Sequence, residues 1–174
     1  MKRTALKRKR ATPRRYKTPR CIYATPTGRQ TCKKPQEHIG RCVTHAKWYL
    51  HGLAREALRT DSCQIDHALL ARVTGTLVRC GGPLQVLHGI DRDELGVTWD
   101  LRNLFWGDAG TNTWGSKNRR RWYAYVREVR GAETYAELER LADGVNRGNV
   151  KVDYGAVERV LRDALQQKAK ELKA

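Results

Sequence analysis

Residues 80–112, CGGPLQVLHGIDRDELGVTWDLRNLFWGDAGTN, carry the pattern that decides the fold. The alternating apolar residues of 84–88 predict a short strand, and the Gly-Gly-Pro before them predicts a hairpin with a second strand over 76–79. A loop rich in glycine and acidic residues follows. A turn over 107–110 then leads into a helix that begins near Thr111. We therefore expect two strands, a loop and a helix, in an α+β fold.

Three polar residues are spaced along this stretch as His88-x14-Asn103-x8-Asn112. The spacing resembles that of the HNH endonucleases, whose core is a ββα-metal unit. The WDLRN motif at 99–103, followed by a Tyr-rich helix that ends in glycine, is similar to the phage recombination nucleases of the NinG/Rap type. The resemblance covers about residues 75–142 and implies a metal-dependent DNA endonuclease.

The resemblance implies a role for each polar residue. His88 would be the general base that deprotonates the attacking water. Asn103 would hold the loop by side-chain hydrogen bonds, and Asn112 would bind or orient a catalytic Mg²⁺ or Mn²⁺ ion. That cation would neutralise charge on the phosphate and on the leaving oxygen. Asp91, Asp100 and Asp108 are possible acidic ligands that could complete the metal site, and Asp91 is the best placed by proximity.

Two departures from the family pattern bear on activity. The residue before the catalytic histidine is usually Asp or His, whereas here it is Leu87, which cannot bind a metal. The pair of CxxC knuckles that often braces the fold is also missing, because Cys80 stands alone and the later positions are Asp108 and Thr111. Either aromatic side chains brace a core without zinc, or activity has been lost.

An Asp-His pair at Asp66 and His67 is a rival for the catalytic position. It has the dipeptide that the family prefers, but it lies 36 residues before Asn103, which is too far for the family spacing. The apolar residues within 65–73 have helical spacing. We therefore interpret His67 as a helix-surface or half-buried histidine.

A separate group of potential ligands lies earlier in the chain, within residues 21–45. These are three cysteines and a histidine, spaced as Cys21-x10-Cys32-x9-Cys42-x2-His45. Such a set can bind zinc tetrahedrally, and the metal would supply folding free energy that this polar segment otherwise lacks. The spacing resembles the short Cys3His fingers of phage and chromatin proteins. We predict a structural zinc knuckle, with His38 and His51 as alternative ligands.

The positive charge of the chain is concentrated in residues 1–60. The 174 residues contain 35 Lys and Arg against 18 Asp and Glu, a net charge of +17. Residues 1–60 hold 17 of the basic and only two of the acidic residues. Residues 1–20 hold ten basic and no acidic residues, which predicts a disordered arm that binds a polyanion. Nucleic acid is the first candidate, since the arm has no apolar face for a membrane surface.

The composition of the chain also indicates the cellular compartment of the protein. No apolar run reaches the roughly 18 residues of a transmembrane helix, and the basic arm lacks the apolar core of a secretory signal. An organellar transit peptide stays an alternative, because such peptides are also Arg-rich and poor in acidic residues. We expect an intracellular protein, in the bacterial host if the chain is phage-encoded. Its five cysteines then favour reduced thiols or metal ligands over disulfides.

Basic residues beside the predicted site are expected to contact DNA phosphates. They are Arg92, Lys117, Arg119, Arg120 and Arg121. Trp114 is the candidate for stacking on an exposed base. These positions flank the proposed catalytic residues and would hold a duplex in register.

The domain organisation that we predict has four parts. They are a basic arm (1–20), a zinc knuckle with a following helix (21–60), a nuclease core (61–142), and a linker with a C-terminal amphipathic helix (143–174). The last helix could pack on the core or against a second copy of the chain, so a homodimer stays open.

The predicted function is a metal-dependent endonuclease that acts on double-stranded or branched DNA in phage recombination. The main alternative is a non-enzymatic zinc-finger protein that binds nucleic acid, such as a transcription regulator or an RNA-binding factor. Leu87 and the missing CxxC pairs favour this alternative.

Overall fold

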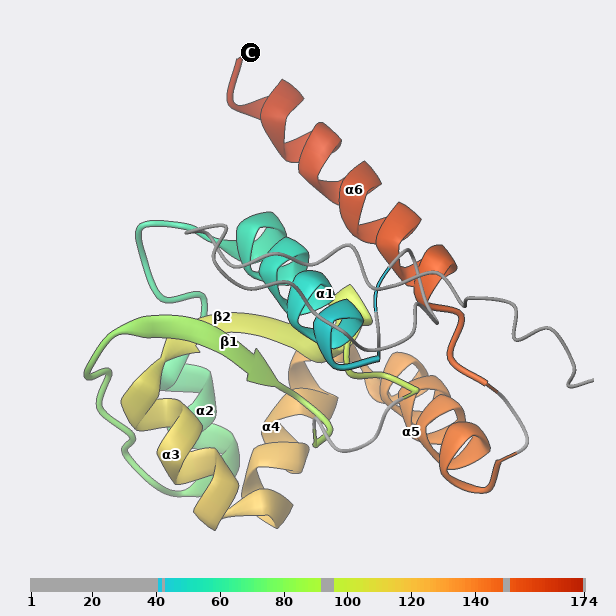
Figure 1. The fold of residues 1–174 in the computed structure, drawn as a ribbon. Helices are drawn as coiled ribbons and strands as arrows, with labels where there is room; N and C mark the ends of the chain where they lie inside the picture. Colours follow the sequence, from blue (N-terminus) through green and yellow to red (C-terminus); the bar gives the residue numbers. More distant parts are fainter. Residues whose placement is uncertain (1–40, 42, 92–95, 149–150, 174) are drawn as a thin grey trace, which may run out of the picture.

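The structure is a computed structural model that describes residues 41, 43–91, 96–148 and 151–173. Its helices and strands are α1 (Val43–Leu58), α2 (His67–Thr74), β1 (Leu84–His88), the 3-10 helix η1 (Leu101–Asn103), β2 (Leu104–Asp108), α3 (Ala109–Lys117), α4 (Arg119–Arg130), α5 (Ala132–Asn146) and α6 (Tyr154–Glu171) (Figure 1). The fold is α+β, as predicted. The basic arm and three of the four knuckle ligands, Cys21, Cys32 and Cys42, lie outside the described residues.

The sheet consists of β1 and β2, which pair antiparallel from Leu84 opposite Asp108 to His88 opposite Leu104. The predicted strand over 76–79 is wrong, because β2 takes its place as the partner of β1. The backbone of that segment bonds elsewhere, since the Val78 carbonyl lies 2.9 Å from the imidazole Nδ1 of His67. The segment before β1 therefore joins α2 to the core instead of extending the sheet.

The observed order is β1, a loop with η1, β2 and α3, whereas the predicted order was two consecutive strands, a loop and a helix. β2 continues through the predicted turn to Asp108, and α3 begins directly after it. The single helix expected from Thr111 onward is two helices that meet at Asn118. The Asn118 side chain donates a 2.9 Å hydrogen bond to the Trp114 carbonyl, and its backbone angles are not helical. Local side-chain bonding of this kind competes with helix continuation.

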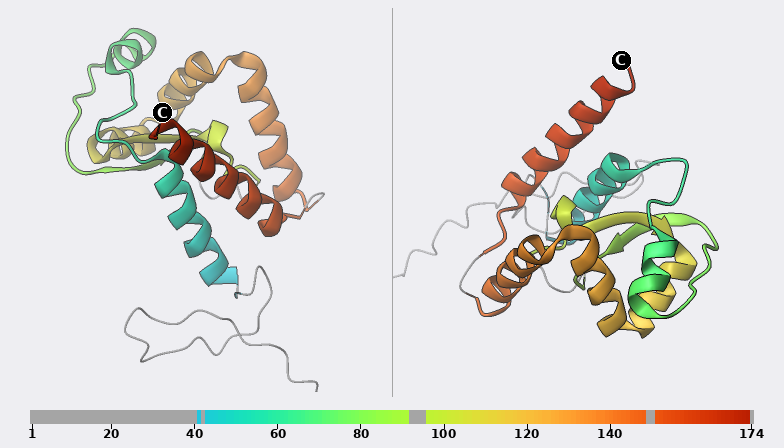
Figure 2. Two further views of the ribbon diagram at one scale, coloured as in Figure 1. Left: turned by 90° about the horizontal axis from the view of Figure 1, so that it is seen from above. Right: turned by 180° about the vertical axis from the view of Figure 1, so that it is seen from behind.

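The two faces of the sheet pack on different helices. Leu87 and Phe105 belong to a core shared with α2, α4 and α5, whereas Val86 and Leu104 contact a second core formed with α1 and α6. Figures 1 and 2 show the sheet between these two groups of helices. Because strand side chains alternate between faces, His88 lies on the same face as Val86, towards α1.

The final helix α6 packs on α1 of the same chain, which is one of the two arrangements that the sequence left open. Leu50 of α1 and Leu161 of α6 are both fully buried in the second core. The hydroxyl of Tyr49 donates a 2.8 Å hydrogen bond to Glu158 across the two helices. The Lys168 ammonium donates to the Glu56 carbonyl at 2.9 Å, near the C-terminal end of α1, where carbonyls lack helical partners.

The helix α5 extends further than the sequence pattern indicated. The linker was predicted to begin at residue 143, but α5 (Ala132–Asn146) continues into it. Within the described part of the chain, no helix combines the length and the apolar character needed to cross a membrane.

Replacement of Leu161 by alanine tests the packing of α6. The side chain is fully buried, so its truncation should lower the free energy of unfolding by about 2–5 kcal/mol. The matched control is Val160→Ala, because the neighbouring Val160 is 55% exposed and should change stability by less than about 0.5 kcal/mol. Equal effects of the two substitutions in urea unfolding would contradict this packing.

Candidate functional site

A pocket of about 490 Å³ lies at the C-terminal end of β1. Its lining includes His88 from β1, Asp91 from the following loop, Asn112 from α3 and Arg119 from α4. It also includes His51, which comes from α1 on the other side of the pocket. Elements far apart in the sequence thus bring two imidazoles, a carboxylate, an amide and a guanidinium to one cavity.

The loop after His88 is held by Asn103, which is 0% exposed. The Asn103 amide oxygen accepts a 2.6 Å hydrogen bond from the backbone N–H of Ile90. Its amide nitrogen donates to the Ile90 carbonyl at 3.1 Å and to the Val97 carbonyl at 3.0 Å. One buried side chain therefore ties together both ends of the loop.

Gly89 fixes the chain directly after His88. Its backbone N–H donates a 2.7 Å hydrogen bond to the carbonyl of Asn103. A Cβ atom at position 89 would lie 2.9 Å from the Asn103 amide oxygen and 2.9 Å from a methyl group of Val126. The indole of Trp122 donates to the His88 carbonyl at 2.9 Å. The backbone of His88 is therefore positioned from the loop and from α4 together.

The imidazole of His88 faces the imidazole of His51. Their ring centroids are 5.7 Å apart in an edge-to-face arrangement, and the His51 ring also lies 6.0 Å from the indole of Trp99. The sequence suggested His51 only as a spare ligand for the zinc knuckle. Its place in the pocket follows from the packing of α1 on the sheet, for which the local sequence contains no signal.

The acidic residue of the pocket is already paired. An Asp91 carboxylate oxygen lies 2.5 Å from a guanidinium nitrogen of Arg119. Leu87 is 1% exposed and packs in the core, so the position before His88 offers no ligand, as expected. Oxygen donors of Asp91 and Asn112 could hold a hard cation, which would share the Asp91 carboxylate with Arg119. Among the residues that the structure describes, no group of three His, Cys, Asp or Glu ligands converges in this pocket.

Most of the predicted DNA contacts lie on the surface of α3 and α4. The exposed basic residues there are Lys117, Arg119, Arg120 and Arg121. Arg121 donates a 2.8 Å hydrogen bond to the hydroxyl of Thr76. Trp114 is half-buried and packs against the core, and Arg92 lies outside the described residues.

The remaining sequence candidates lie away from the pocket. His45 is in the first turn of α1, where its ring contacts that of Trp48 at a centroid distance of 5.0 Å. Asp66 is the N-cap of α2, and its carboxylate accepts a 2.9 Å hydrogen bond from the Leu69 N–H. The rival Asp66–His67 pair therefore has a capping carboxylate and does not line the pocket with His88.

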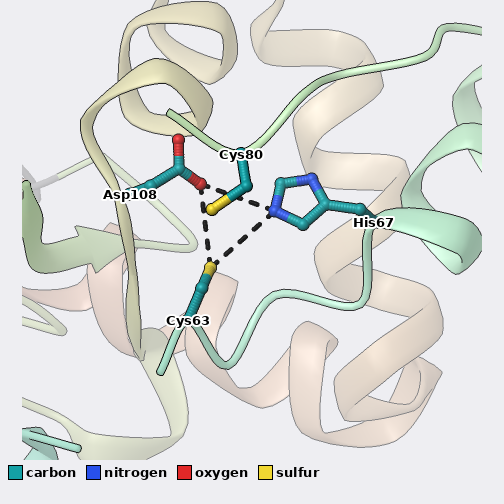
Figure 3. A group of neighbouring side chains, drawn as sticks. All are labelled: Cys63, His67, Cys80 and Asp108. Atoms are coloured by element: carbon teal, nitrogen blue, oxygen red, sulfur yellow. Dashed lines mark hydrogen bonds and ion pairs between the residues drawn. The ribbon is translucent and has the colours of Figure 1, made fainter. Parts of the chain in front are cut away.

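A second cluster of side chains could hold a metal ion. It consists of Cys63, His67, Cys80 and Asp108, whose ligand atoms all lie within 4.8 Å of one another (Figure 3). The two cysteines are reduced. The cluster joins the start of α2, the segment before β1 and the junction of β2 with α3.

Within this cluster, ionisation is favoured at Asp108 and disfavoured at Cys80. Burial disfavours the charged form of Asp108, but hydrogen bonds from the Thr111 hydroxyl and from the backbone N–H groups of Gly81 and Thr111 outweigh it and lower the pKa of this carboxyl. Partial desolvation, together with the negative charge of Asp108, raises the pKa of the Cys80 thiol to about 11. Without a cation, the cluster therefore holds a carboxylate beside a protonated thiol.

Sequence reasoning missed this cluster because its members are scattered. In the sequence, Cys80 has no partner that would complete a CxxC pair, and the helical spacing around His67 predicts a helix-surface or half-buried histidine. The available signal was Cys63-x3-His67, a spacing of about one helical turn. Asp108, at a position where the nucleases that the sequence resembles often have cysteine, was the second signal. Only the folded chain shows that these two signals belong together.

Replacement of Asn103 by alanine tests the anchoring of the loop. Each buried backbone group that loses its partner should cost about 1–3 kcal/mol in the free energy of unfolding, and three such groups bond to this side chain. The matched control is Asn112→Ala, which removes an amide that is only partly buried. We expect chemical denaturation to show a large loss for Asn103→Ala and little change for Asn112→Ala; similar losses would contradict the anchoring role.

Comparison with known proteins found no matching family model, no matching curated protein and no matching solved structure. The function must therefore be argued from the residues and their geometry. The pocket at His88 and the cluster at Asp108 are the two sites with chemistry to explain.

Proposed function

We propose that the chain is a metal-dependent endonuclease of the HNH type, which hydrolyses phosphodiester bonds in DNA. The observation that supports this proposal is the convergence of His88, Asp91 and Asn112 on one pocket at the end of β1. These residues come from a strand, a loop and the helix that follows the second strand. Asn103 supports the same loop from the buried side.

His88 is the general base in this mechanism. Hydrolysis of a phosphodiester needs a water that is deprotonated near neutral pH, and an imidazole has a pKa suited to that task. The rigid backbone around His88, fixed through Gly89 and Trp122, would keep the ring at a constant position relative to the scissile phosphate. Asn103 acts as a positioning residue, because its side chain bonds the loop and not the substrate.

A divalent cation, Mg²⁺ or Mn²⁺, would supply charge neutralisation at the phosphate. Asn112 and Asp91 are the residues that would hold it. Arg119, whose side chain is 64% exposed, pairs with Asp91 and could also contact a DNA phosphate. His51, on the opposite wall, would be the second imidazole near the reacting groups.

DNA would approach over α3 and α4. Lys117, Arg120 and Arg121 are exposed on these helices beside the pocket, and basic side chains in such positions bind phosphates without reading the sequence. The excess positive charge of residues 1–60 would add affinity for the same polyanion. The proposed substrates are double-stranded or branched DNA.

The alternative function is a nucleic-acid-binding protein without catalytic activity. Two observations favour it: Leu87 is buried where the family has a metal ligand, and the Asp91 carboxylate is engaged by Arg119. RNA is a possible partner in this case. The alternative shares the basic surface with the enzyme but needs no cation in the pocket.

A cleavage assay separates the two functions. The full chain is incubated with supercoiled, linear and branched DNA in Mg²⁺, Mn²⁺ or EDTA, beside His88→Ala and, as a control on the same surface, Lys117→Ala. We expect cleavage that requires the metal and falls by about 10²–10⁴-fold in His88→Ala, with a small change in Lys117→Ala. Equal cleavage by His88→Ala would contradict the assigned base, and tight binding without cleavage by the wild type would support the alternative.

A further inference from the structure

We infer that Cys63, His67, Cys80 and Asp108 form a structural zinc site that clamps the segment before β1 onto the core. This inference goes beyond the proposed nuclease, because it concerns different residues and does not depend on cleavage activity. It also differs from the predicted knuckle, with which it shares no ligand.

The spacing of the donor atoms fits tetrahedral zinc. Zinc bonds of about 2.3 Å to sulfur and about 2.0–2.2 Å to nitrogen or oxygen place neighbouring ligand atoms roughly 3.4–3.8 Å apart. The sulfur of Cys63 lies 3.8 Å from His67 Nε2 and 3.7 Å from Asp108 Oδ2. His67 Nε2 lies 3.5 Å from Asp108 Oδ2. Three edges of the tetrahedron therefore already have the required length.

Cys80 completes the set as the fourth ligand. Its sulfur lies within 4.8 Å of each of the other three donor atoms and points towards them (Figure 3). Cys80 is exposed and is followed by two glycines. A small shift of this segment would bring the sulfur to bonding distance.

The imidazole of His67 is oriented for metal binding. Its Nδ1 lies 2.9 Å from the carbonyl oxygen of Val78. Because a carbonyl oxygen can only accept, this contact places a proton on Nδ1, so that in the neutral imidazole the Nε2 lone pair is directed at Cys63 and Asp108. A carbonyl that holds the far nitrogen of a ligating histidine is the usual second partner in zinc sites.

The carboxylate of Asp108 is fixed in the same way. One oxygen accepts hydrogen bonds of 2.9 Å from the backbone N–H groups of Gly81 and Thr111. The other oxygen accepts a 2.7 Å hydrogen bond from the Thr111 hydroxyl and faces Cys63 and His67. A carboxylate oxygen has a further lone pair for a metal, so Asp108 needs no rearrangement to serve as a ligand.

The donor set selects zinc over the hard cations. Two thiolates and an imidazole suit a borderline ion such as Zn²⁺, whereas Mg²⁺ and Ca²⁺ prefer ligands that are all oxygen. Four protein ligands leave no open position for a substrate, which is typical of a structural site. The site therefore stabilises the fold and carries no chemistry of its own.

The site lies on the segment that joins α2 to β1, which hydrogen bonds to Asp108 and to the start of α3 also hold in place. Residues 75–83 form no helix or strand, yet they cross from α2 to β1 along a defined path. A metal bound to Cys80 would fix this path to α2 through Cys63 and His67. Asp108 is also the N-cap of α3, the helix that carries Asn112. Metal binding would thus steady the helix that forms one wall of the pocket.

Zinc content in a variant that lacks the knuckle cysteines tests the inference. Cys21→Ser, Cys32→Ser and Cys42→Ser together leave Cys63 and Cys80 as the only thiols of the chain. We expect one zinc per chain by elemental analysis, and Co²⁺ in its place should give the visible absorption of a tetrahedral thiolate site. Adding Cys63→Ser should lower the zinc content at least tenfold, whereas adding His51→Ala should leave it unchanged.

Alkylation of the wild-type chain gives a second measurement that does not depend on the folding of these variants. Although Cys80 is exposed, its thiol should resist iodoacetamide until a chelator removes the metal. The Cys63 thiol should become reactive at the same time as the Cys80 thiol. Rapid alkylation of both before chelation, absence of zinc, or a Cys63–Cys80 disulfide by mass spectrometry would overturn the site. Zinc retained by a chain that does not cleave DNA would leave the site standing and count against the nuclease alone.

Discussion

The pairing of β1 with β2 is the constraint on which both sites depend. Its register places His88 opposite Leu104 at one end and Leu84 opposite Asp108 at the other. At the first end, Asn103 comes directly before β2 and reaches the loop that follows His88. At the second end, Asp108 lies beside the segment that enters β1 and accepts the Gly81 N–H. A shift of one residue would reverse the faces of every side chain and would separate both sets of residues.

Two buried polar side chains secure this register from its ends. Asn103 and Asp108 are both fully buried, and both bond to backbone groups of segments that have no regular structure. A buried polar group without a hydrogen-bond partner lowers stability, whereas one with its partners favours a single arrangement of the chain around it. The apolar cores on the two faces of the sheet supply most of the stability, whereas these two side chains decide where the irregular segments lie.

Local patterns in the sequence predicted those parts of the structure that depend on neighbouring residues. The strand over 84–88 and the α+β class are confirmed. The strand over 76–79 is wrong, because a β-like run of residues can also serve as a connecting segment. Periodicity could not show that Asn118 interrupts a helix by bonding to Trp114.

Features that require tertiary packing were beyond such reasoning. His51 reaches the pocket only because α1 packs on the sheet, and the metal cluster draws on four segments spread over residues 63–108. The roles assigned to His88 and Asn112, as well as the zinc knuckle at Cys21, Cys32, Cys42 and His45, stay predictions.

Three parts of the chain have three different proposed tasks. The N-terminal charge would give affinity for a polyanion, the Asp108 cluster would hold the irregular segments, and the His88 pocket would carry the chemistry. Arg119 joins the His88 pocket to the basic surface of α4, because it pairs with Asp91 and is exposed on that helix. The division implies that folding, binding and cleavage respond to different substitutions.

Chemical rescue of His88→Gly by free imidazole tests the central claim most directly. If His88 is the general base, the variant should fail to cleave DNA in Mg²⁺ or Mn²⁺, and added imidazole should restore part of the metal-dependent rate in proportion to its concentration. The wild-type rate should change little under the same conditions. Cleavage by the variant at the wild-type rate, or a wild type that never cleaves, would contradict the account.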